Sequence, residues 1–496
     1  RGAVTWGDGA IGVTGEVSAT NSLVGSQAGD SVGSSGVMAL SNGNYVVASS
    51  NWANGGASKA GAVTWGNGAS GETTGLVSDA NSLVGSRASD SVGSSGVTVL
   101  TNGNYVVASQ SWDSDTATDV GAVTWGNGAS GVTGAVSDAN SLVGSTANDK
   151  VGANGVTALT NGNYVVRSSN WNNIGASKAG AVTWGNGEGG TVGEVSATNS
   201  LVGKTANDFV GSNGVTALTN GNYVVTSPNW DSDTATNVGA VTWGNGEGGT
   251  VGEVSKDNSL VGATAGDQVG NGYMMALANG NYVVGSVSWA NIGASKAGAV
   301  TWGNGEGGTV GEVSATNSLV GTTADDEVGY NGVIELTNGN YVVLSDRWNN
   351  IGAANAGAVT WGNGEGGTVG EVSKDNSLVG TTADDRVGAM DEDPNNPTYL
   401  YKATVIALSN GNYVVASPDW NADTANTVGA VTWGDGVNGT IGEVSATNSL
   451  VGVTADDRVG SGDVTALTNG NYVVASPSWD NDGVLNAGAV TWGSGT

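Results

Sequence analysis

The sequence predicts an all-β fold, an eight-bladed β-propeller built from four-stranded antiparallel blades. Three observations predict it. A unit of about 59 residues is repeated eight times, each unit has the pattern of short strands joined by tight turns, and the chain holds 87 Gly but 5 Pro and 1 Phe. A period of this length is typical of modular folds in which each unit packs against its neighbours.

The repeat is marked by the block Gly-Ala-Val-Thr-Trp-Gly. Seven of the eight spacings between its copies are 59 or 60 residues, and the other is 72. We therefore expect residues 1–496 to form a single propeller domain, with an insertion at 391–403 and a surplus strand at 488–496. The eight repeats start near residues 2, 61, 121, 180, 239, 298, 357 and 429.

Residues 150–203 show how one repeat is expected to fold. Residues 156–159 and 164–166 flank an Asn-Gly pair, which is a strong hairpin signal because both central residues of a type I′ turn need a positive φ. Residues 180–184 are the predicted third strand, and residues 200–203 the fourth. Each repeat therefore predicts one meander sheet.

The two ends of the chain suggest how the sheets close into a ring. A lone four-stranded sheet cannot bury both faces, whereas eight sheets stacked around an axis can. The chain begins with third and fourth strands (2–6, 22–25) and ends with first, second and third strands (464–467, 472–474, 488–492). We expect strands from both termini to complete one blade. The alternative is a β-solenoid or open superhelix, against which the Asn-Gly hairpin argues.

The charge and composition exclude several function classes. The formal net charge is −30, so the surface repels nucleic acid and anionic membranes. With no Cys and no His, the chain lacks thiol and imidazole chemistry and the usual zinc ligands. No apolar stretch approaches the roughly 18 residues that span a bilayer. The chain begins at Arg1 rather than Met, which indicates a processed or excerpted segment.

Two sets of tryptophans recur. One ends the third strand and is expected to pack between blades. The other follows the second strand at the mouth of a variable loop, where core packing is the first expectation and a multivalent ring of glycan-stacking or partner-binding indoles is the alternative. The members of this second set are Trp52, Trp112, Trp171, Trp230, Trp289, Trp348, Trp420 and Trp479.

One aspartate per repeat stands two residues before a Val-Gly pair. We expect its carboxylate to accept backbone N–H groups of its turn and to hold adjacent sheets in register. A ring of carboxylates binding calcium is the alternative, since hard cations need several converging oxygens. Eight equivalent carboxylates do not supply the two different environments that glycoside hydrolysis needs. The set is Asp30, Asp90, Asp149, Asp208, Asp267, Asp326, Asp385 and Asp457.

Variable loops and the insertion are the remaining candidate sites. The loop of the second repeat carries Asp113, Asp115 and Asp119, spaced like a loose cation loop but without the glycine and closing glutamate of an EF-hand. The acidic insertion carries Tyr399 and Tyr401, which are candidate ligand-binding residues. The alternative is that the insertion is a surface loop that the fold tolerates and that has no binding role.

The repeat also resembles two known families. Asp457-Arg-Val-Gly460, the segment 469–477 and Gly488-Ala-Val-Thr-Trp492 are similar to FG-GAP repeats of integrin-α-type propellers, although the loop that binds calcium there is shortened to Asn-Gly-Asn. A second resemblance is to repeats of large bacterial exoproteins of the filamentous-haemagglutinin type. It rests on the motif Gly-Asn-Tyr-Val-Val-Ala-Ser-Pro followed by Gly-Ala-Val-Thr-Trp-Gly-Asn-Gly. This second resemblance implies a secreted or cell-surface, adhesin-like protein.

Together these observations predict a non-enzymatic extracellular module with a structural or adhesive role. We expect self-association, with filaments formed through the surplus strand, or a cell-surface or glycan partner. Multivalent glycan binding is the alternative function. No cofactor is expected, with calcium as the one open alternative, and neither nucleic-acid binding nor membrane insertion is expected.

Overall fold

The computed structural model describes residues 1–391, 402–423 and 425–496. The described residues form 42 short strands and no helix; accordingly, no helix that could span a bilayer is found among them. The chain divides into two compact units, one made of 1–234 with 240–259 and the other of 235–239 with 260–496.

Counted from its first strand to its fourth, each repeat has its strands in the same order. The first strands are β3 (Val37–Ala39), β8 (Val97–Val99), β13 (Val156–Ala158), β18 (Gly214–Ala217), β23 (Met274–Ala276), β28 (Val333–Glu335), β35 (Val405–Ala407) and β40 (Asp463–Ala466). The second are β4 (Tyr45–Ser49), β9 (Tyr105–Ser109), β14 (Tyr164–Ser168), β19 (Tyr223–Ser227), β24 (Tyr282–Ser286), β29 (Tyr341–Ser345), β36 (Tyr413–Ser417) and β41 (Tyr472–Ser476).

The third strands are β1 (Ala3–Val4), β5 (Ala62–Gly66), β10 (Ala122–Gly126), β15 (Ala181–Gly185), β20 (Ala240–Gly244), β25 (Ala299–Gly303), β30 (Ala358–Gly362), β37 (Ala430–Gly434) and β42 (Ala489–Gly493). The fourth are β2 (Leu23–Val24), β7 (Ser82–Val84), β12 (Ser141–Val143), β17 (Ser200–Val202), β22 (Ser259–Val261), β27 (Leu319–Val320), β32 (Ser377–Val379) and β39 (Ser449–Val451). The insertion is flanked by β33 (Met390–Asp391) and β34 (Lys402–Ala403), which pair with each other.

Within a repeat these strands form the predicted antiparallel meander. In the third repeat β13 pairs with β14, β14 with β15 and β15 with β17, with Val165 opposite Trp184 and Val182 opposite Leu201. The second strand is buried along nearly its whole length, as its Tyr-Val-Val sequence predicts. The four predicted strands are thus confirmed in the seven repeats from β3 to β39, and three of them in the repeat of β40 to β42.

The turn of the first hairpin differs from the predicted type I′. In the first repeat the Gly43 N–H donates to the Leu40 carbonyl at 3.1 Å, and the Leu40 N–H donates to Asn44 at 2.8 Å. Gly43 has a φ of 88°, whereas Asn42 does not have a positive φ. This is the three-residue loop in which a type I turn is followed by one left-handed residue. The Asn side chain is thereby freed for a contact between repeats.

Six of the sheets gain a fifth strand from the following repeat, and the sheet β1-β2-β6 gains its third strand in the same way, which the sequence alone did not predict. β11 pairs in parallel with β7, so Gly134 lies opposite Leu83. The other fifth strands join the preceding fourth strand in the same way. They are β6 (Gly75–Leu76), β11 (Gly134–Ala135), β16 (Gly193–Glu194), β21 (Gly252–Glu253), β26 (Gly311–Glu312), β31 (Gly370–Glu371) and β38 (Gly442–Glu443). Consecutive repeats therefore share a hydrogen-bonded sheet.

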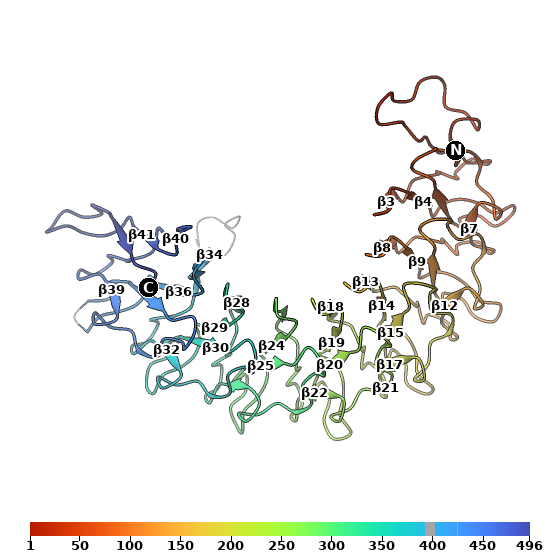
Figure 1. The fold of residues 1–496 in the computed structure, drawn as a ribbon. Coiled ribbons are helices and arrows are strands. Elements are labelled where there is room, and N and C mark those ends of the chain that lie inside the picture. Colours follow the sequence, from red (N-terminus) through yellow and green to blue (C-terminus); the bar gives the residue numbers. More distant parts are fainter. Residues whose placement is uncertain (392–401, 424) are drawn as a thin grey trace. The chain divides into compact units, whose positions relative to one another are not determined.

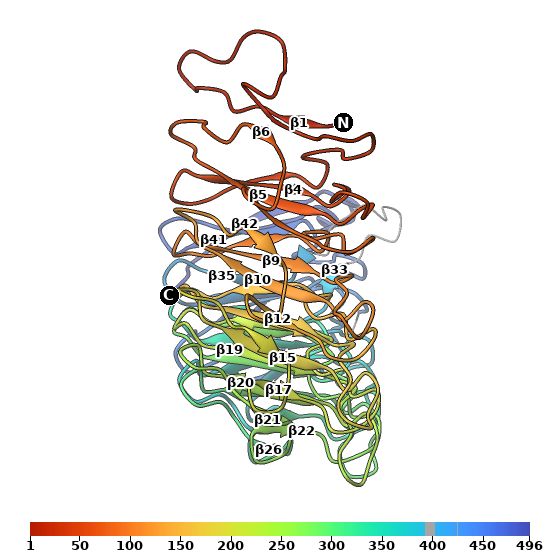
Figure 2. The same ribbon diagram turned by 90° about the vertical axis from the view of Figure 1, so that its right-hand side faces the viewer.

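In the first unit the sheets follow the chain. The order is β1-β2-β6, then β3-β4-β5-β7-β11, β8-β9-β10-β12-β16 and β13-β14-β15-β17-β21. Figure 1 shows their strands in red to yellow, and Figure 2 shows consecutive sheets lying face to face. Val106, Val123 and Leu142 of one sheet pack with Tyr164 and Val166 of the next. The cores thus lie between sheets, where each faces its neighbour.

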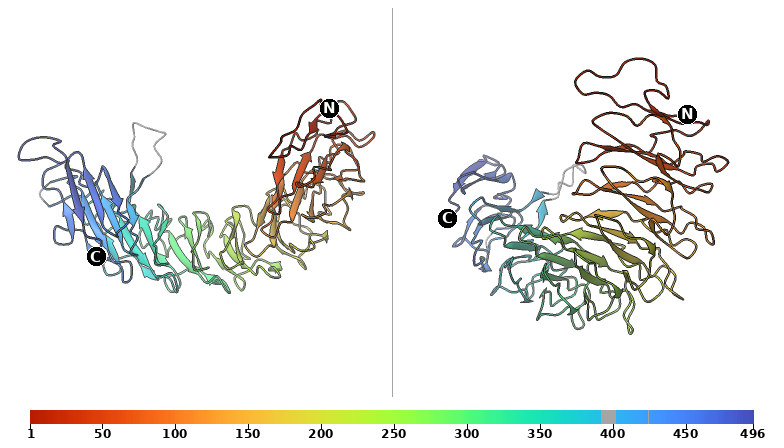
Figure 3. Two further views of the ribbon diagram at one scale, coloured as in Figure 1. Left: turned by 45° about the horizontal axis from the view of Figure 1, so that its top comes forward. Right: turned by 45° about the vertical axis from the view of Figure 1, so that its right-hand side comes forward.

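The second unit repeats this arrangement. Its sheets are β23-β24-β25-β27-β31, β28-β29-β30-β32-β38, the four-stranded β35-β36-β37-β39 and the three-stranded β40-β41-β42. The strand arrows of successive sheets run side by side in Figure 3. Val342, Val359 and Leu378 pack with Tyr413 and Val415 of the following sheet.

The blade predicted from strands of both chain ends is not confirmed. The sheet β1-β2-β6 and the sheet β40-β41-β42 are separate, so a closed eight-bladed propeller is not confirmed. The surplus strand explains why: β42 pairs with β41 over five residues, from Tyr472–Gly493 to Ser476–Ala489. A strand joined to β41 by a short loop loses less chain entropy on pairing than a strand more than 400 residues away. β42 therefore takes the edge that β1 would need.

Candidate functional site

Successive repeats are fastened by one glycine carbonyl that accepts three hydrogen bonds, here called the latch. The Gly187 carbonyl accepts from Asn102 Nδ2 at 2.9 Å, Asn104 Nδ2 at 2.8 Å and Trp125 Nε1 at 2.9 Å, all in the preceding repeat. The Gly187 N–H in turn donates to Asn163 Oδ1 of its own repeat. The same three-donor latch occurs at Gly128, Gly246, Gly364, Gly436 and Gly495.

The latch explains the first tryptophan set and the two Asn of the hairpin. Trp125 and Trp184 point their indole N–H groups at the next repeat, as expected for packing between sheets. The role of the two Asn was missed, because Asn-Gly-Asn is also the sequence of an ordinary turn. Trp492, for which no later repeat follows among the described residues, is 60% exposed.

The recurrent aspartates lie fully buried in turns. Asp149 Oδ2 accepts the N–H groups of Ser145 and Thr146, and its Oδ1 accepts the N–H of Asn172 from the next sheet. This is the expected arrangement, in which a carboxylate joins two loops. The pKa of Asp90 and of Asp208 is raised above the usual value of an aspartate, because burial outweighs the opposing effect of the hydrogen bonds from their turns.

The second tryptophan set lies largely in the core. Seven of its members, from Trp52 to Trp420, are 4–6% exposed. Trp479, in the last repeat, is half-buried. Burial to this degree leaves little of an indole face for a sugar to stack on. The indole N–H groups of Trp52, Trp112, Trp171, Trp230, Trp348 and Trp420 are buried without a hydrogen-bond partner in the described structure.

The acidic loop of the second repeat satisfies its own carboxylates. Asp113 Oδ1 accepts the Asp119 N–H at 2.7 Å, and Asp115 pairs with Arg87 at 2.6 Å. Among residues 1–391, 402–423 and 425–496 no cluster of three or more acidic side chains is arranged to hold a metal ion. Tyr399 and Tyr401 lie outside the described residues.

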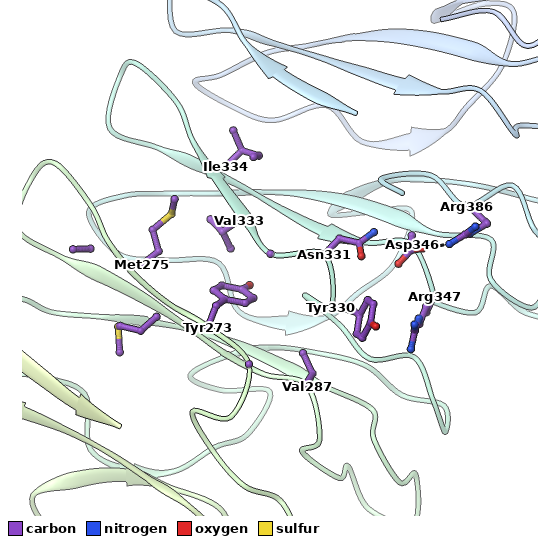
Figure 4. Close-up of a pocket in the computed structure, with 14 residues that line it drawn as sticks. Tyr273, Met275, Val287, Tyr330, Asn331, Val333, Ile334, Asp346, Arg347 and Arg386 are labelled. Carbon is purple, nitrogen blue, oxygen red and sulfur yellow. Dashed lines mark hydrogen bonds and ion pairs between the residues drawn. The ribbon is translucent and has the colours of Figure 1, made fainter. Parts of the chain in front are cut away.

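A pocket of about 890 Å³ opens between repeats five and six, within the second unit. Its walls come from the first strands β23 and β28 and the loops around them (Figure 4). Met275, Val333 and Ile334 lie toward one end, with the Tyr273 ring beside them, and Met274 also lines the pocket. A pocket of this size and apolar character suits a small molecule or one or two side chains of a partner.

The Tyr273 ring sits in a space opened by a second departure from the repeat. Gly285 replaces a larger residue found at this position of every other repeat, and a Cβ there would lie 2.4 Å from the Tyr273 ring. The Tyr273 hydroxyl is buried without a partner, and burial raises its pKa. Tyr273 itself stands where five other repeats carry a glycine with a positive φ, namely Gly36, Gly96, Gly155, Gly214 and Gly332.

Charged groups gather at the other end of the pocket. Arg386 bonds to Asp346 Oδ2 at 2.9 Å, while Asp346 Oδ1 has no partner and the residue is 1% exposed. Arg347 lies over the Tyr330 ring at 3.5 Å and pairs with Glu327. Both arginine side chains stay 40% exposed. The pocket thus joins an apolar end to an end with free guanidinium N–H donors and one buried, unpartnered carboxylate oxygen.

This pocket was not predicted from the sequence, although the sequence carries a signal for it. Its residues are departures from a nearly constant repeat: Asp346 stands where others have Ser, Gln, Val or Pro, and Tyr330 where others have Ser, Ala or Asn. Aligning the repeats and collecting substitutions that are unique to one repeat would have selected these positions. Their spacing of about one repeat predicts that they meet across a sheet boundary.

Comparisons with solved structures give low similarity. The chain is similar to the PQQ-bound form of aldose sugar dehydrogenase from Streptomyces coelicolor at 10% identity, covering 68% of this chain and 92% of that one, with a TM-score of 0.22. It is similar to an endo-1,5-alpha-L-arabinanase from Thermotoga petrophila RKU-1 at 12% identity, covering 70% of this chain and 81% of that one, with a TM-score of 0.21. It is also similar to an exo-beta-1,3-galactanase from Clostridium thermocellum at 13% identity, covering 79% of this chain and 90% of that one, with a TM-score of 0.22. We infer no activity from them.

The repeats themselves match a described family. No curated protein matches the sequence. A family model described as "Repeat of unknown function (DUF5650)" matches nearly the whole chain, over residues 1–34, 39–94, 99–153, 158–212, 217–271, 276–330, 335–389, 407–461 and 466–496. The chain, a tandem array of all-β units, therefore belongs to the DUF5650 repeat family.

Proposed function

We propose that this chain is a non-enzymatic structural and adhesive module of a secreted or surface-exposed bacterial protein. The latch is the observation that supports it best: the Asn, Trp and Gly residues that recur in every repeat are used to join repeats, as at Gly187. The recurrent carboxylates are likewise buried in turns, as at Asp149. Recurrent polar groups thus serve cohesion rather than a repeated reaction centre.

An extracellular location is part of this proposal. The resemblance of the repeat to filamentous-haemagglutinin-type exoproteins supports it. Structural calcium remains a further proposal, and a melting curve with and without a chelator tests it. A melting temperature that does not change in excess chelator would refute a structural role for calcium.

Filament formation through the surplus strand is the assembly that we propose. β42 pairs with β41, whereas its opposite edge has no fourth-strand partner among the described strands. Val490 and Trp492 on this strand are 76% and 60% exposed. A free edge next to exposed apolar side chains favours strand addition by another copy. The test is the particle size with and without residues 488–496, and monomers in both would refute it.

The adhesive role is tested on the whole chain. Beads coated with the folded chain should aggregate with one another or attach to bacterial or epithelial cells, whereas beads coated with urea-unfolded chain should not. The same protein should release no reducing ends from a panel of polysaccharides. Sustained turnover of any polysaccharide, or beads that neither aggregate nor attach, would contradict the proposal.

A second candidate function, multivalent glycan binding, is favoured by two equivalent grooves. In the third repeat a groove of about 810 Å³ is lined by Trp171, Ile174 and Glu194. In the sixth a groove of about 700 Å³ is lined by the corresponding Trp348, Ile351 and Glu371. The isoleucines at the loop tips are fully exposed, and the indole N–H groups beside them lack partners in the described structure. Weak sites repeated along an array gain avidity from multivalency.

A glycan array separates the two candidates. Binding that falls when Trp171→Ala and Trp348→Ala are combined with Ile174→Ser and Ile351→Ser would support the grooves. The Ile variants alone are the safer probes, because they alter exposed side chains rather than the core. Absence of glycan binding by the unchanged chain would end this candidate.

A further inference from the structure

We propose that the pocket between repeats five and six binds an extended peptide segment of a protein partner, with a bulky apolar side chain next to a carboxylate. This deepens the adhesive part of the proposed function and rests on it. The composition of the pocket is the first argument. Two of the chain's four methionines line it, together with two tyrosines and two arginines. Met, Tyr and Arg are the residues enriched at protein interfaces.

The apolar end is shaped for one large side chain. Met274 and Met275 are unbranched and adjust to different shapes, and the Tyr273 ring provides a flat wall beside them. The neighbouring Val333 and Ile334 come from β28, so the walls belong to two successive sheets. A side chain inserted here would be covered on several sides, which is where interface anchors gain most of their binding energy.

The polar end fits the backbone and the carboxylate of the same segment. The unpartnered Asp346 Oδ1, in a residue that is 1% exposed, needs an N–H or O–H donor. A peptide backbone supplies one at each residue. Arg386 and Arg347 each use part of their five N–H donors on Asp346 and Glu327, and both are 40% exposed. Their remaining donors suit a carboxylate, in a chain whose surface is otherwise strongly acidic.

Fluorescence anisotropy of labelled hexapeptides tests the proposal. The probe has phenylalanine and aspartate as its central pair, flanked by glycine and serine. Two matched peptides carry lysine in place of the aspartate, or glycine in place of the phenylalanine. We expect each change to weaken binding about tenfold, which corresponds to about 1.4 kcal/mol. Equal binding of the three peptides, or no binding of the first, would overturn the proposal.

Variants of the full chain locate the site. Tyr273→Gly combined with Gly285→Ala restores residues that other repeats carry, so the fold should persist while the probe binds at least about tenfold more weakly. Arg386→Ala should remove the preference for aspartate over lysine. Arg458→Ala is the matched control, because Arg458 holds the same position one repeat later and pairs with Asp419. It should change binding less than about twofold.

The remaining outcomes are also decisive. Probe binding that survives Tyr273→Gly with Gly285→Ala would place the peptide elsewhere and refute the site. Displacement of the probe by free monosaccharides would make the pocket a sugar site and refute the peptide. Beads that attach to cells although no peptide binds would leave the proposed function standing and remove this inference alone.

Discussion

The latch at Gly187 and the pocket at Tyr273 are built on the same repeat, but they differ in how the sequence varies. At the latch every participating residue recurs, and all the donors and the acceptor are satisfied. At the pocket the residues depart from the repeat, and Asp346 Oδ1 and the Tyr273 hydroxyl are left without partners. Within this near-identical array, the recurrent residues hold repeats together, and we propose that the departures at Tyr273 and Asp346 mark a site of recognition.

The most damaging change should be at the latch. In Gly187→Ala the added Cβ would lie 1.8 Å from the Gly162 carbonyl oxygen and 3.1 Å from Asn102 Nδ2, so the backbone must shift and the three bonds weaken. We expect a loss of about 4 kcal/mol in the stability of the adjoining repeats, measured by urea unfolding. Gly189→Ala, in the same loop with nothing within 4 Å of its Cβ, is the control. Equal effects of the two changes would refute the latch.

The next largest effect concerns pH. Burial raises the pKa of Tyr164 to about 12, above its usual value of 10. Between these values the unfolded chain has lost the proton and the folded chain retains it. Stability is therefore complete below pH 10 and falls as the pH rises toward 12, by about 1.4 kcal/mol per pH unit for this group. In Tyr164→Phe the stability should fall less steeply with pH by that amount. Identical slopes would contradict it.

A smaller loss is expected at the turn carboxylates. Asp149→Asn places an amide NH₂ or a weaker acceptor against the N–H groups of Ser145, Thr146 and Asn172. We expect a loss of about 2 kcal/mol in urea unfolding. Asp115→Asn is the comparison, because that side chain is 98% exposed and its ion pair with Arg87 is solvated. Its loss should stay below about 1 kcal/mol. A reversed order would refute the buried role.

The smallest effect on stability should come from the pocket. Tyr273→Gly with Gly285→Ala returns repeat five to the residues found in other repeats and removes a buried hydroxyl that has no partner. We expect the free energy of unfolding, measured with urea, to change by less than about 1 kcal/mol. A loss as large as that of Gly187→Ala would show that this pair serves packing, and the contrast between cohesion and recognition would fail.

Much of the local structure could be predicted from the repeat. The four strands, the hairpin and the turn role of Asp149 follow from residue types that have few alternatives. The fifth strand could not be predicted, because Gly134-Ala135 is two residues long and has no alternation of its own. Its pairing depends on a neighbour about 50 residues away, at Leu83. The pocket escaped prediction because Tyr273 and Gly285 explain each other only when their contact is seen.

Ring closure shows the same limit. The strands at the two termini predict closure, but competition between β1 and β42 for one edge is decided by loop length rather than by strand sequence. The local partner prevails whenever both sequences are equally good, as Ala-Val-Thr-Trp is here in both copies.

In the five-stranded sheets the last strand is supplied by the following repeat, so the boundaries of the sequence repeat do not coincide with those of the folded sheet. A fragment cut at the boundaries of one repeat would leave the edge of its fourth strand unpaired. It would also carry a fifth strand whose pairing partner lies in the preceding repeat. The smallest piece that contains one complete five-stranded sheet spans from Val37 to Ala135, well over one period. Conversely, unequal crossing-over that adds or removes whole periods preserves every pairing, so an array of this kind can lengthen or shorten during evolution without redesign of its joints.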